Sequence, residues 1–532
     1  MPHVTIIGAG IAGLAAALRL LERGFHVTLL ERHMFLGGKL AAHQDRTGGD
    51  FHEHAYHMYL NWYHNFWRIA DEIGVRDRFQ PQHRMSYLRS GAGDWRPRMS
   101  HAADVGSIAT AWYNVMNGPM SPADMYLYAF SMVDLLGTPM PRTARLDQMS
   151  VQGFLNTRPY MTEGAMSMQN DLLLKAFACP SYLTAADAFH RYVSFGYRNP
   201  TPMMWLLRGN TQEQLFAPLL RHIRRIADDG TAQGRFDLRA LHKVTRLRLD
   251  DAGRVCAIEG NILDEPAPGP SQSDPPTTGH FKVDVAGDAI LAIPPDQAKL
   301  LVHADVFARA PSLGNIASLH CQPMCSLDLY FKRPVDLPEG PVDLLDSRFK
   351  LSFLDTSRLW RGKDDGQPPF INVVASDSRA IYRYRPGTIR DLMLKELMLY
   401  LPISPDDVDL PRSVVHPNAT EELFINEVGS WDLRPATDCE IPNLFLAGDY
   451  CRNLIDVVTI EAAVVSGLLA AEAVRARAGV GSPVEIIAPK SASPWPLAGL
   501  KLAGQPYAYA AQALSTAQRW WTGAYREMFP RG

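Results

Sequence analysis

Three glycines near the start of the chain have the spacing of a dinucleotide-binding turn. Gly8, Gly10 and Gly13 follow the hydrophobic segment 3–7. Gly8 permits a tight turn at the end of a strand, Gly10 lets the backbone approach a pyrophosphate, and Gly13 allows a helix to pack closely on the sheet. The amide groups at the start of that helix then face the phosphates. We therefore predict that this turn, including Ala12, binds an anionic dinucleotide.

Two strands and a helix must position this turn, and the sequence supplies them in order. Residues 3–7 predict the first strand, the small and apolar residues 14–21 predict a helix, and residues 25–30 predict a second strand. Glu31 follows the second strand, where its carboxylate can accept hydrogen bonds from both hydroxyls of an adenosine ribose. This order of elements within about thirty residues predicts a Rossmann-like domain and an α/β fold.

Either NAD or FAD could occupy that motif, and a second glycine pair favours FAD. Gly37 and Gly38 follow the ribose site and precede Lys39. Such a loop can pass beneath a pyrophosphate while Lys39 or Arg32 supplies positive charge. We therefore expect Arg32, Gly38 and Lys39 to lie at the cofactor.

A second conspicuous segment lies near the other end of the chain. The hydrophobic residues 441–447 predict a strand that ends in Gly448 and Asp449. Asp449 can hydrogen-bond a ribityl hydroxyl or lie near the pyrophosphate, while Gly448 allows close approach. Thr459 and Ile460 open a helix whose positive end can face the flavin N1/C2 region, where negative charge accumulates in the reduced cofactor. A strand and helix that only pack together would not require Gly-Asp at their joint, so the two halves of the site predict FAD.

Several further segments, in order along the chain, resemble one family of flavoproteins. These segments are 37–42, 53–59, 207–211, 288–294 and 433–437. They resemble the phytoene desaturase, zeta-carotene desaturase and hydroxysqualene dehydroxylase family, within the amine oxidase superfamily. The resemblance runs from residue 2 to about 475. It departs at Ala462, where the family usually has glycine, and the chain after residue 480 has no clear counterpart.

The resemblance also implies residues that the local patterns do not reveal. It places Tyr56, His57 and Met58 near the flavin ring and the backbone of Val244 on the adenine side. For His57, three roles stay open: contact with the flavin, a hydrogen-bonded core histidine, or proton transfer. His57 is therefore a weak catalytic candidate, and we name no other catalytic residue.

A cluster of histidines invites a metal-binding hypothesis. His52, His54, His57 and His64 fall within thirteen residues, beside Glu53. Their spacing does not match His-Glu-x-x-His, and no carboxylate–cysteine cluster supports them. We therefore predict no metal site here.

The resemblance divides the chain into interleaved domains. We expect a discontinuous FAD-binding domain of the amine oxidase and phytoene desaturase type, an α+β substrate-binding and membrane-facing domain inserted into it, and a C-terminal extension. Their respective ranges are 1–90, 210–300 and 435–475; 91–209 and 301–434; and 480–532.

The resemblance implies a flavin-dependent oxidoreductase. We expect hydride transfer from a carbon of an apolar isoprenoid, such as a carotenoid precursor, to flavin N5, with a quinone as electron acceptor. Alternatives are dehydroxylation or isomerisation of another lipid or squalene-type substrate, and oxidation of an amine. The amine alternative is weakened because neither Cys439 nor Cys451 lies in a recognisable flavin-attachment motif. A lipid chaperone on the same fold would lose the flavin motif, and Gly448 with Asp449 argues against that hypothesis.

Composition limits the partners and the location. The chain has 532 residues and a formal net charge of -3, which gives no electrostatic reason to expect a nucleic-acid partner. Its six cysteines show neither a disulfide framework nor a zinc pattern, and no stretch is apolar enough to span a bilayer. We expect a cytoplasmic protein, with peripheral association at the inner face of the membrane as an open alternative.

Methionine and aromatic residues gather in two regions that bear on this question. Segments 111–137 and 203–207 are rich in both types, which suits either a helical core or a lipid channel. The extension carries Trp495, Trp520 and Trp521 with Arg519 nearby. That pattern predicts either docking at a membrane interface or packing across the protein's own surface.

Overall fold

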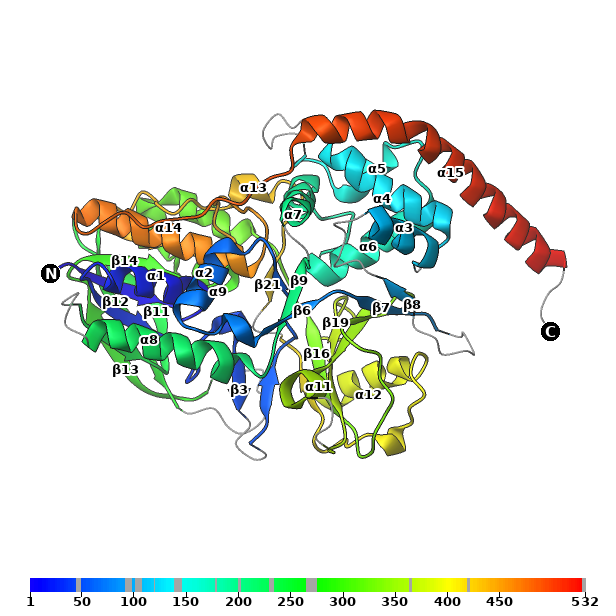
Figure 1. The fold of residues 1–532 in the computed structure, drawn as a ribbon. Coiled ribbons are helices and arrows are strands. Elements are labelled where there is room, and N and C mark those ends of the chain that lie inside the picture. Colours follow the sequence, from blue (N-terminus) through cyan, green and yellow to red (C-terminus); the bar gives the residue numbers. More distant parts are fainter. Residues whose placement is uncertain are drawn as a thin grey trace.

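The computed structural model describes residues 1–44, 49–90, 98–100, 108–118, 120–137, 146–177, 179–199, 202–228, 234–264, 275–362, 366–418 and 422–528. Three regions are visible in Figure 1: a sheet with flanking helices that contains the N-terminus, a group of helices, and a second sheet below those helices.

A five-stranded parallel sheet forms the centre of the first region. Its strand order is β10 (Phe236–Arg239), β2 (His26–Leu30), β1 (His3–Ile7), β14 (Asp288–Leu291) and β22 (Leu444–Leu446). The strands β1, β2, β14 and β22 are buried over most of their length, so both faces of this part of the sheet are covered. The α/β fold expected from the sequence is therefore observed, and it assembles strands that are more than four hundred residues apart.

Neighbouring residues of β1 face two different cores. Ile6 packs with α1 (Ile11–Leu21) and α14 (Ile460–Ala478), whereas Ile7 packs with β11 (His242–Leu249), β12 (Val255–Leu263) and β13 (Thr277–Asp284). Helices α1 and α14 touch backbone to backbone, because a Cβ on Gly467 would lie 2.1 Å from the carbonyl oxygen of Ala12. This contact places the start of α14 beside the glycine turn.

A seven-stranded mixed sheet forms the second region. Its strand order is β20 (Val414–His416), β16 (Cys325–Tyr330), β19 (Phe370–Ala375), β18 (Leu351–Asp355), β17 (Val342–Leu344), β7 (Met85–Leu88) and β8 (Arg98–Ser100). Helix α12 (Pro386–Leu397) packs on one face. We grouped residues 85–88 with the FAD-binding domain, but they pair in parallel with β17, so backbone pairing places them in this second sheet.

The helical region consists of α3 (Ile108–Asn117), α4 (Pro122–Leu136), α5 (Val151–Asn156), α6 (Glu163–Phe177) and α7 (Ala186–Arg198). The small sheet of β5 (Tyr59–Leu60), β9 (Met204–Leu207) and β6 (Phe79–Gln82) lies between this region and the first one (Figure 1). Among the remaining elements are β3 (Ala42–Gln44), β4 (Phe51–Glu53), α2 (His64–Glu72), α8 (Ala217–Asp228), α9 (Pro295–Ala298), α10 (Ala304–Arg309), β15 (Cys321–Gln322), α11 (Thr356–Arg361), β21 (Leu423–Phe424) and α13 (Ser430–Leu433).

The C-terminal extension forms one long helix, α15 (Pro494–Met528), which contains Pro506 and is bent (Figure 1). Its first part packs along α4: Lys501 Nζ lies 2.7 Å from Asp134 Oδ1, and the Ser515 hydroxyl donates to Asp124 Oδ1 at 2.7 Å. Its far end projects beyond the other helices. Packing on the protein's own surface is thus observed for the inner face of α15. Within the described part of the chain, no helix combines the length and apolarity that crossing a bilayer requires.

Candidate functional site

One cavity of about 1540 Å³ connects the glycine turn with the helical region. Single ligand pockets usually measure roughly 300–1,000 Å³, so this cavity has room for a cofactor and a second molecule. Gly8, Gly10 and Glu31 line one part, while side chains of α3, α4 and α7 line another. The cavity therefore joins the predicted cofactor site to the region predicted to bind substrate.

The three glycines of the turn have different roles. Gly8 has φ +102°, and a Cβ there would lie 2.5 Å from the carbonyl oxygen of Ala292. A Cβ on Gly10 would meet no atom within 4 Å, so the backbone at Gly10 faces open space. A Cβ on Gly13 would lie 2.0 Å from the carbonyl oxygen of Gly8, and Gly13 does not line the cavity. Our assignment of Gly13 as a cofactor contact is therefore corrected: it permits the helix to pack against the turn.

Glu31 is held beside this turn by two backbone amides. Its Oε2 accepts from Ala9 N at 2.7 Å and its Oε1 accepts from His33 N at 3.0 Å. Each carboxylate oxygen keeps a lone pair for another donor. The buried carboxylate also lines the cavity, where ribose hydroxyls could reach it.

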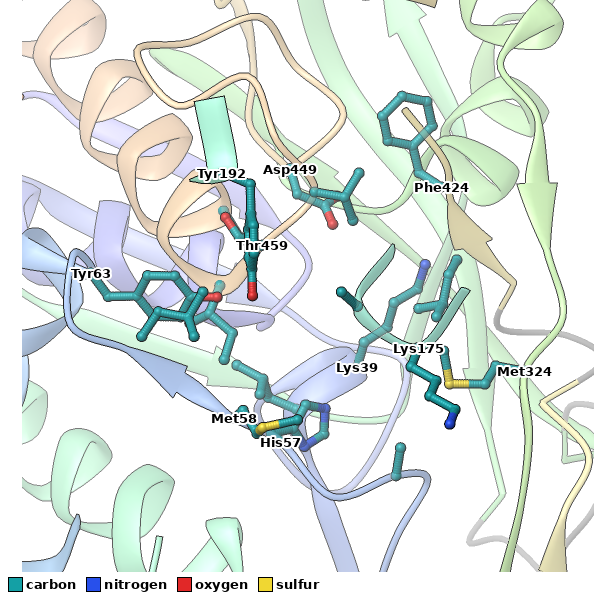
Figure 2. A pocket seen from close by; sticks show the side chains of 18 of the residues that line it. Lys39, His57, Met58, Tyr63, Lys175, Tyr192, Met324, Phe424, Asp449 and Thr459 are labelled. Atoms are coloured by element: carbon teal, nitrogen blue, oxygen red, sulfur yellow. The ribbon is translucent and has the colours of Figure 1, made fainter. Parts of the chain in front are cut away.

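The second glycine pair approaches the first one. Gly37 N donates to the carbonyl oxygen of Ala9 at 2.9 Å, and a Cβ on Gly38 would lie 3.2 Å from the Cα of Gly10. Lys39 follows in the same loop and lines the cavity (Figure 2), as does Arg32. The positive charge expected here is therefore present.

Asp449 faces the same space from the opposite end of the chain (Figure 2). Burial raises the pKa of this carboxyl group, while the positive charges of Lys39 and Arg434 act against that shift. Gly448 N donates to the Ser466 hydroxyl oxygen at 2.8 Å, which ties the Gly-Asp turn to α14.

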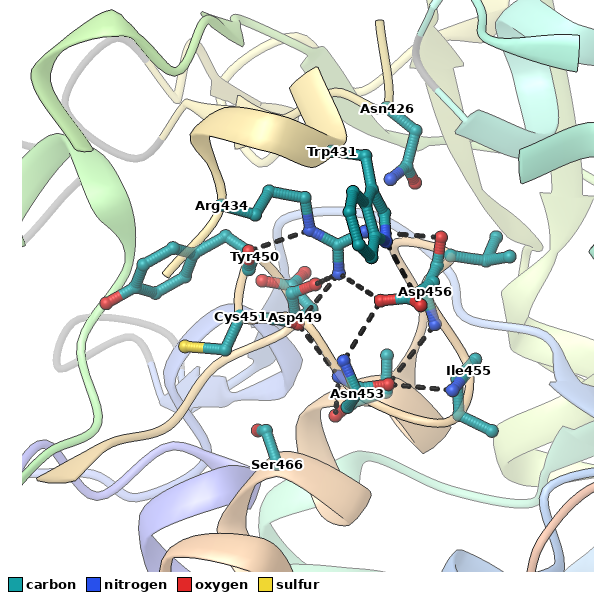
Figure 3. Close-up of polar contacts among 12 residues, drawn as sticks. Asn426, Trp431, Arg434, Asp449, Tyr450, Cys451, Asn453, Ile455, Asp456 and Ser466 are labelled. Atoms are coloured by element: carbon teal, nitrogen blue, oxygen red, sulfur yellow. Dashed lines mark hydrogen bonds and ion pairs between the residues drawn. The ribbon is translucent and has the colours of Figure 1, made fainter. Parts of the chain in front are cut away.

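A buried arginine holds the loop that follows this turn. Arg434 donates to the carbonyl oxygens of Tyr450 at 2.9 Å and Cys451 at 2.7 Å, and it lies 3.2 Å from Asp456 Oδ1 (Figure 3). Asn453 makes further hydrogen bonds across the same loop. Segment 433–437 is singled out in the sequence only because it resembles the family. The fold shows that the Arg434 side chain holds this loop in place through hydrogen bonds and an ion pair.

The start of α14 also opens into the cavity. The Thr459 hydroxyl oxygen caps the helix by accepting from Ala462 N at 3.2 Å. Thr459 lines the cavity (Figure 2), and so does Ile460. The positive end of the helix is thus directed at the space that a flavin ring would need.

Glu461, one residue further on, points away from the cavity. Its carboxylate accepts from the backbone amides of Asn65 at 2.8 Å and Phe66 at 2.9 Å, at the start of α2. Burial raises the pKa of Glu461 to about 7, although these hydrogen bonds favour the charged form. Sequence reasoning missed this role, since a glutamate in the first turn of a helix is ordinary by itself.

Tyr56, His57 and Met58 line the cavity together, as the resemblance implies for residues near the ring. His57 and Met58 are labelled in Figure 2. The Tyr56 hydroxyl donates to Ser352 Oγ at 3.0 Å. His57 Nδ1 has no hydrogen-bond partner among the described residues and lies 3.9 Å from Glu53 Oε2, so the three roles proposed for His57 stay open. Val244 lines the cavity from β11.

The histidines of segment 52–64 do not converge on one point. His52 instead joins Asp328 and His416, with ligand-type atoms within 4.8 Å of one another. His52 Nδ1 lies 2.8 Å and His416 Nε2 lies 3.1 Å from Asp328 Oδ2. Burial raises the pKa of Asp328, but the two imidazoles more than offset this effect and leave it below its usual range. Hydrogen bonding accounts for the cluster, and the expectation that no metal binds stays a prediction.

The far part of the cavity is lined largely by apolar side chains. Methionines contribute from several elements, and they adapt to irregular apolar ligands. These methionines are Met58, Met85, Met125, Met132, Met203, Met204 and Met324. The methionine-rich segments of the sequence thus supply both core packing and part of the cavity wall.

Known proteins resemble this chain both in sequence and in fold. A sequence model of the family described as "Flavin containing amine oxidoreductase" matches residues 11–475. A 15-cis-phytoene desaturase of an Oncidium hybrid cultivar is 24% identical over 491 residues, covering 89% of this chain and 77% of that relative. A zeta-carotene desaturase of Synechocystis is 24% identical over 510 residues, covering 89% and 97%. A putrescine oxidase structure has a TM-score of 0.61 at 15% identity, covering 90% of this chain and 99% of that one, and shares the fold.

Proposed function

Since the chain belongs to the family of flavin-containing amine oxidoreductases, and is therefore a flavin-dependent oxidoreductase with FAD as its cofactor, we propose that it dehydrogenates carbon–carbon bonds of an apolar isoprenoid. The observation that carries this proposal is the single cavity that begins at the dinucleotide turn and continues between methionine and aromatic side chains. The names of the carotenoid desaturase relatives support it.

Different residues of the site are assigned to different parts of the cofactor. Gly10 leaves room for the pyrophosphate, Glu31 is placed for the ribose, and the start of α14 favours negative charge at the ring. When bound, FAD would supply a hydride acceptor at its N5 atom. Holding a long apolar chain beside that atom supplies more of the rate than acid–base chemistry would. His57 is the one side chain that we propose as a proton carrier.

Oxidation of an amine fits the cavity less well. The far part of the cavity is lined largely by apolar side chains, which would not stabilise a cationic substrate, and the cysteines, all of them described, do not line the cavity. Dehydroxylation or isomerisation of a squalene-type chain would use the same cavity, and the product separates these reactions from desaturation.

The outer face of α15 supports a peripheral position at a lipid surface. Trp495, Leu502 and Trp520 are 78%, 70% and 71% exposed. The two charged residues between 494 and 521, Lys501 and Arg519, are 32% and 39% exposed and pair with acidic residues of the helical region. An exposed helix face with several tryptophans and few charges is typical of an interfacial helix.

The same helix also lines the cavity at its start, through Pro496 and Leu497. If the protein is cytoplasmic and lies at the inner face of the membrane, a lipid-soluble substrate could enter the cavity there. A quinone in the membrane could accept the electrons of the reduced flavin. This arrangement is our proposal for location and electron acceptor.

The decisive experiment is anaerobic reduction of the FAD-loaded protein. We expect acyclic polyenes in detergent to bleach the visible absorbance of the flavin and to yield a product with a longer conjugated system. Bleaching by a primary amine, with none by any polyene, would overturn the proposal. Subsequent addition of a quinone should restore the absorbance faster than oxygen does.

A further inference from the structure

The cavity wall contains a charged pair in addition to the charged residues assigned to the cofactor site. Lys175 on α6 places its Nζ 3.3 Å from Asp343 Oδ1 on β17, and their side chains are only 9% and 7% exposed. Both line the cavity, and Figure 2 shows Lys175 among the side chains of its wall. A pure hydrocarbon would gain nothing from these two charges.

Neighbouring strands add polar side chains to the same face. Asp343 pairs with Ser352, and Ser352 pairs with Val374, so these positions form one row across β17, β18 and β19. Ser376 follows Val374 by two residues and lines the cavity as well. We call Lys175, Asp343, Ser352, Ser376 and the Tyr56 hydroxyl the polar patch.

Two donors of the polar patch are not satisfied within the protein. Lys175 Nζ and Ser376 Oγ are buried and have no hydrogen-bond partner among the described residues. The contact between Lys175 and Asp343 is an ion pair that leaves N–H groups directed elsewhere. Buried polar groups without partners are costly, which indicates an oxygen atom supplied by a ligand.

Charge balance indicates what kind of oxygen this is. Lys175 and Asp343 neutralise each other, and the adjacent Asp171 is paired with Lys350 at 2.7 Å. A carboxylate or phosphate would add an uncompensated negative charge in a buried place. A hydroxyl or carbonyl oxygen would accept from Lys175 or Ser376 without that cost.

We infer that the polar patch binds a neutral oxygen atom, hydroxyl or carbonyl, of an otherwise apolar isoprenoid ligand. This inference rests on the proposed function and narrows its substrate class. In that reaction two ligands have the required chemistry: an oxygenated substrate and a quinone acceptor. The two half-reactions of the enzyme distinguish them.

The test compares Lys175→Met with the wild type, using an acyclic polyene and the same polyene carrying one hydroxyl group. Binding is followed through the perturbation of the flavin spectrum, and turnover through anaerobic reduction and quinone reoxidation. In the wild type, we expect the hydroxylated chain to bind roughly tenfold to a hundredfold more tightly than the hydrocarbon. Lys175→Met should abolish that preference without weakening the hydrocarbon.

Lys501→Met is the matched control, because Lys501 also pairs with a buried aspartate but does not line the cavity. Ser376→Ala is the second variant, with an expected several-fold loss of preference, should Lys175→Met fold poorly. If the patch instead serves the acceptor, Lys175→Met will slow only reoxidation by the quinone.

The inference would be overturned if quinone reoxidation is unchanged in Lys175→Met and either the wild type binds both chains equally or the variant keeps the wild-type preference. Failure of every polyene to reduce the flavin would overturn the proposed reaction instead, while the spectral binding preference would still decide the role of the patch.

Discussion

Replacing Gly10 with alanine should separate cofactor binding from folding. Gly10 has φ -68°, which alanine adopts without strain, and the new Cβ would meet no protein atom within 4 Å. The apoprotein should therefore keep its free energy of unfolding to within about 0.5 kcal/mol. The methyl group would, however, stand where the backbone approaches the pyrophosphate.

The expected loss is that of hydrogen bonds to a charged phosphate. Such bonds contribute about 1.5–3 kcal/mol, so the Kd for FAD should rise roughly 10- to 150-fold. Titration of the apoprotein with FAD, followed by quenching of flavin fluorescence, measures this change. Thermal unfolding of the same apoprotein measures stability.

Two further alanine substitutions calibrate this result. Gly387→Ala adds the same methyl group into open space on α12, so FAD affinity should stay at the wild-type value and the free energy of unfolding should rise by about 0.4–1 kcal/mol. Gly13→Ala should lower the stability of the apoprotein itself, because its Cβ would lie 2.0 Å from the carbonyl oxygen of Gly8. Wild-type FAD affinity in Gly10→Ala, or a loss of apoprotein stability there, would refute this account of the turn.

Three other predictions follow from the contacts around the site. Burial raises the pKa of Glu461 to about 7, so the folded protein holds a proton that the unfolded chain releases near pH 4.5. As the pH rises from 4.5 to about 7, the free energy of unfolding of the wild type should therefore fall by about 3 kcal/mol relative to that of Glu461→Gln. Arg434→Met should lower the free energy of unfolding by about 3–5 kcal/mol in denaturant titrations and weaken FAD binding, because its carbonyl and carboxylate partners stay buried. Trp520→Ser with Trp521→Ser should reduce co-sedimentation with phospholipid vesicles, whereas Leu399→Ser, at a residue that is also largely exposed but lies on another surface, should not.

Each of these predictions has a contrary outcome. A pH-independent stability difference would mean that Glu461 titrates outside this window. If Arg434→Met is as stable as the wild type, the loop does not depend on the contacts that Arg434 makes with it. Equal vesicle binding in the tryptophan and leucine variants would remove the support that α15 gives to a membrane position.

The sequence by itself determined the cofactor half of the molecule. The turn at Gly8 and Gly10, the acid Glu31 and the joint at Gly448 and Asp449 are each specified by neighbouring residues, because a tight turn and a close backbone approach depend on local conformation. Their common cavity follows from the order of the parallel strands, whereas the family resemblance implied only that the FAD-binding domain is discontinuous.

Only the tertiary structure decided the remaining features. Gly13 contacts the turn rather than the cavity, and Glu461 secures a helix that lies far away in the sequence. Lys175 lies on a helix and Asp343 on a strand, and the fold brings their side chains into contact. Neither residue belongs to a sequence motif. No local sequence pattern predicts such contacts, because they depend on which strands pair at the sheet edges and on which helices cover the sheets. The identity of the second ligand therefore depends on side chains whose proximity arises only when the chain has folded.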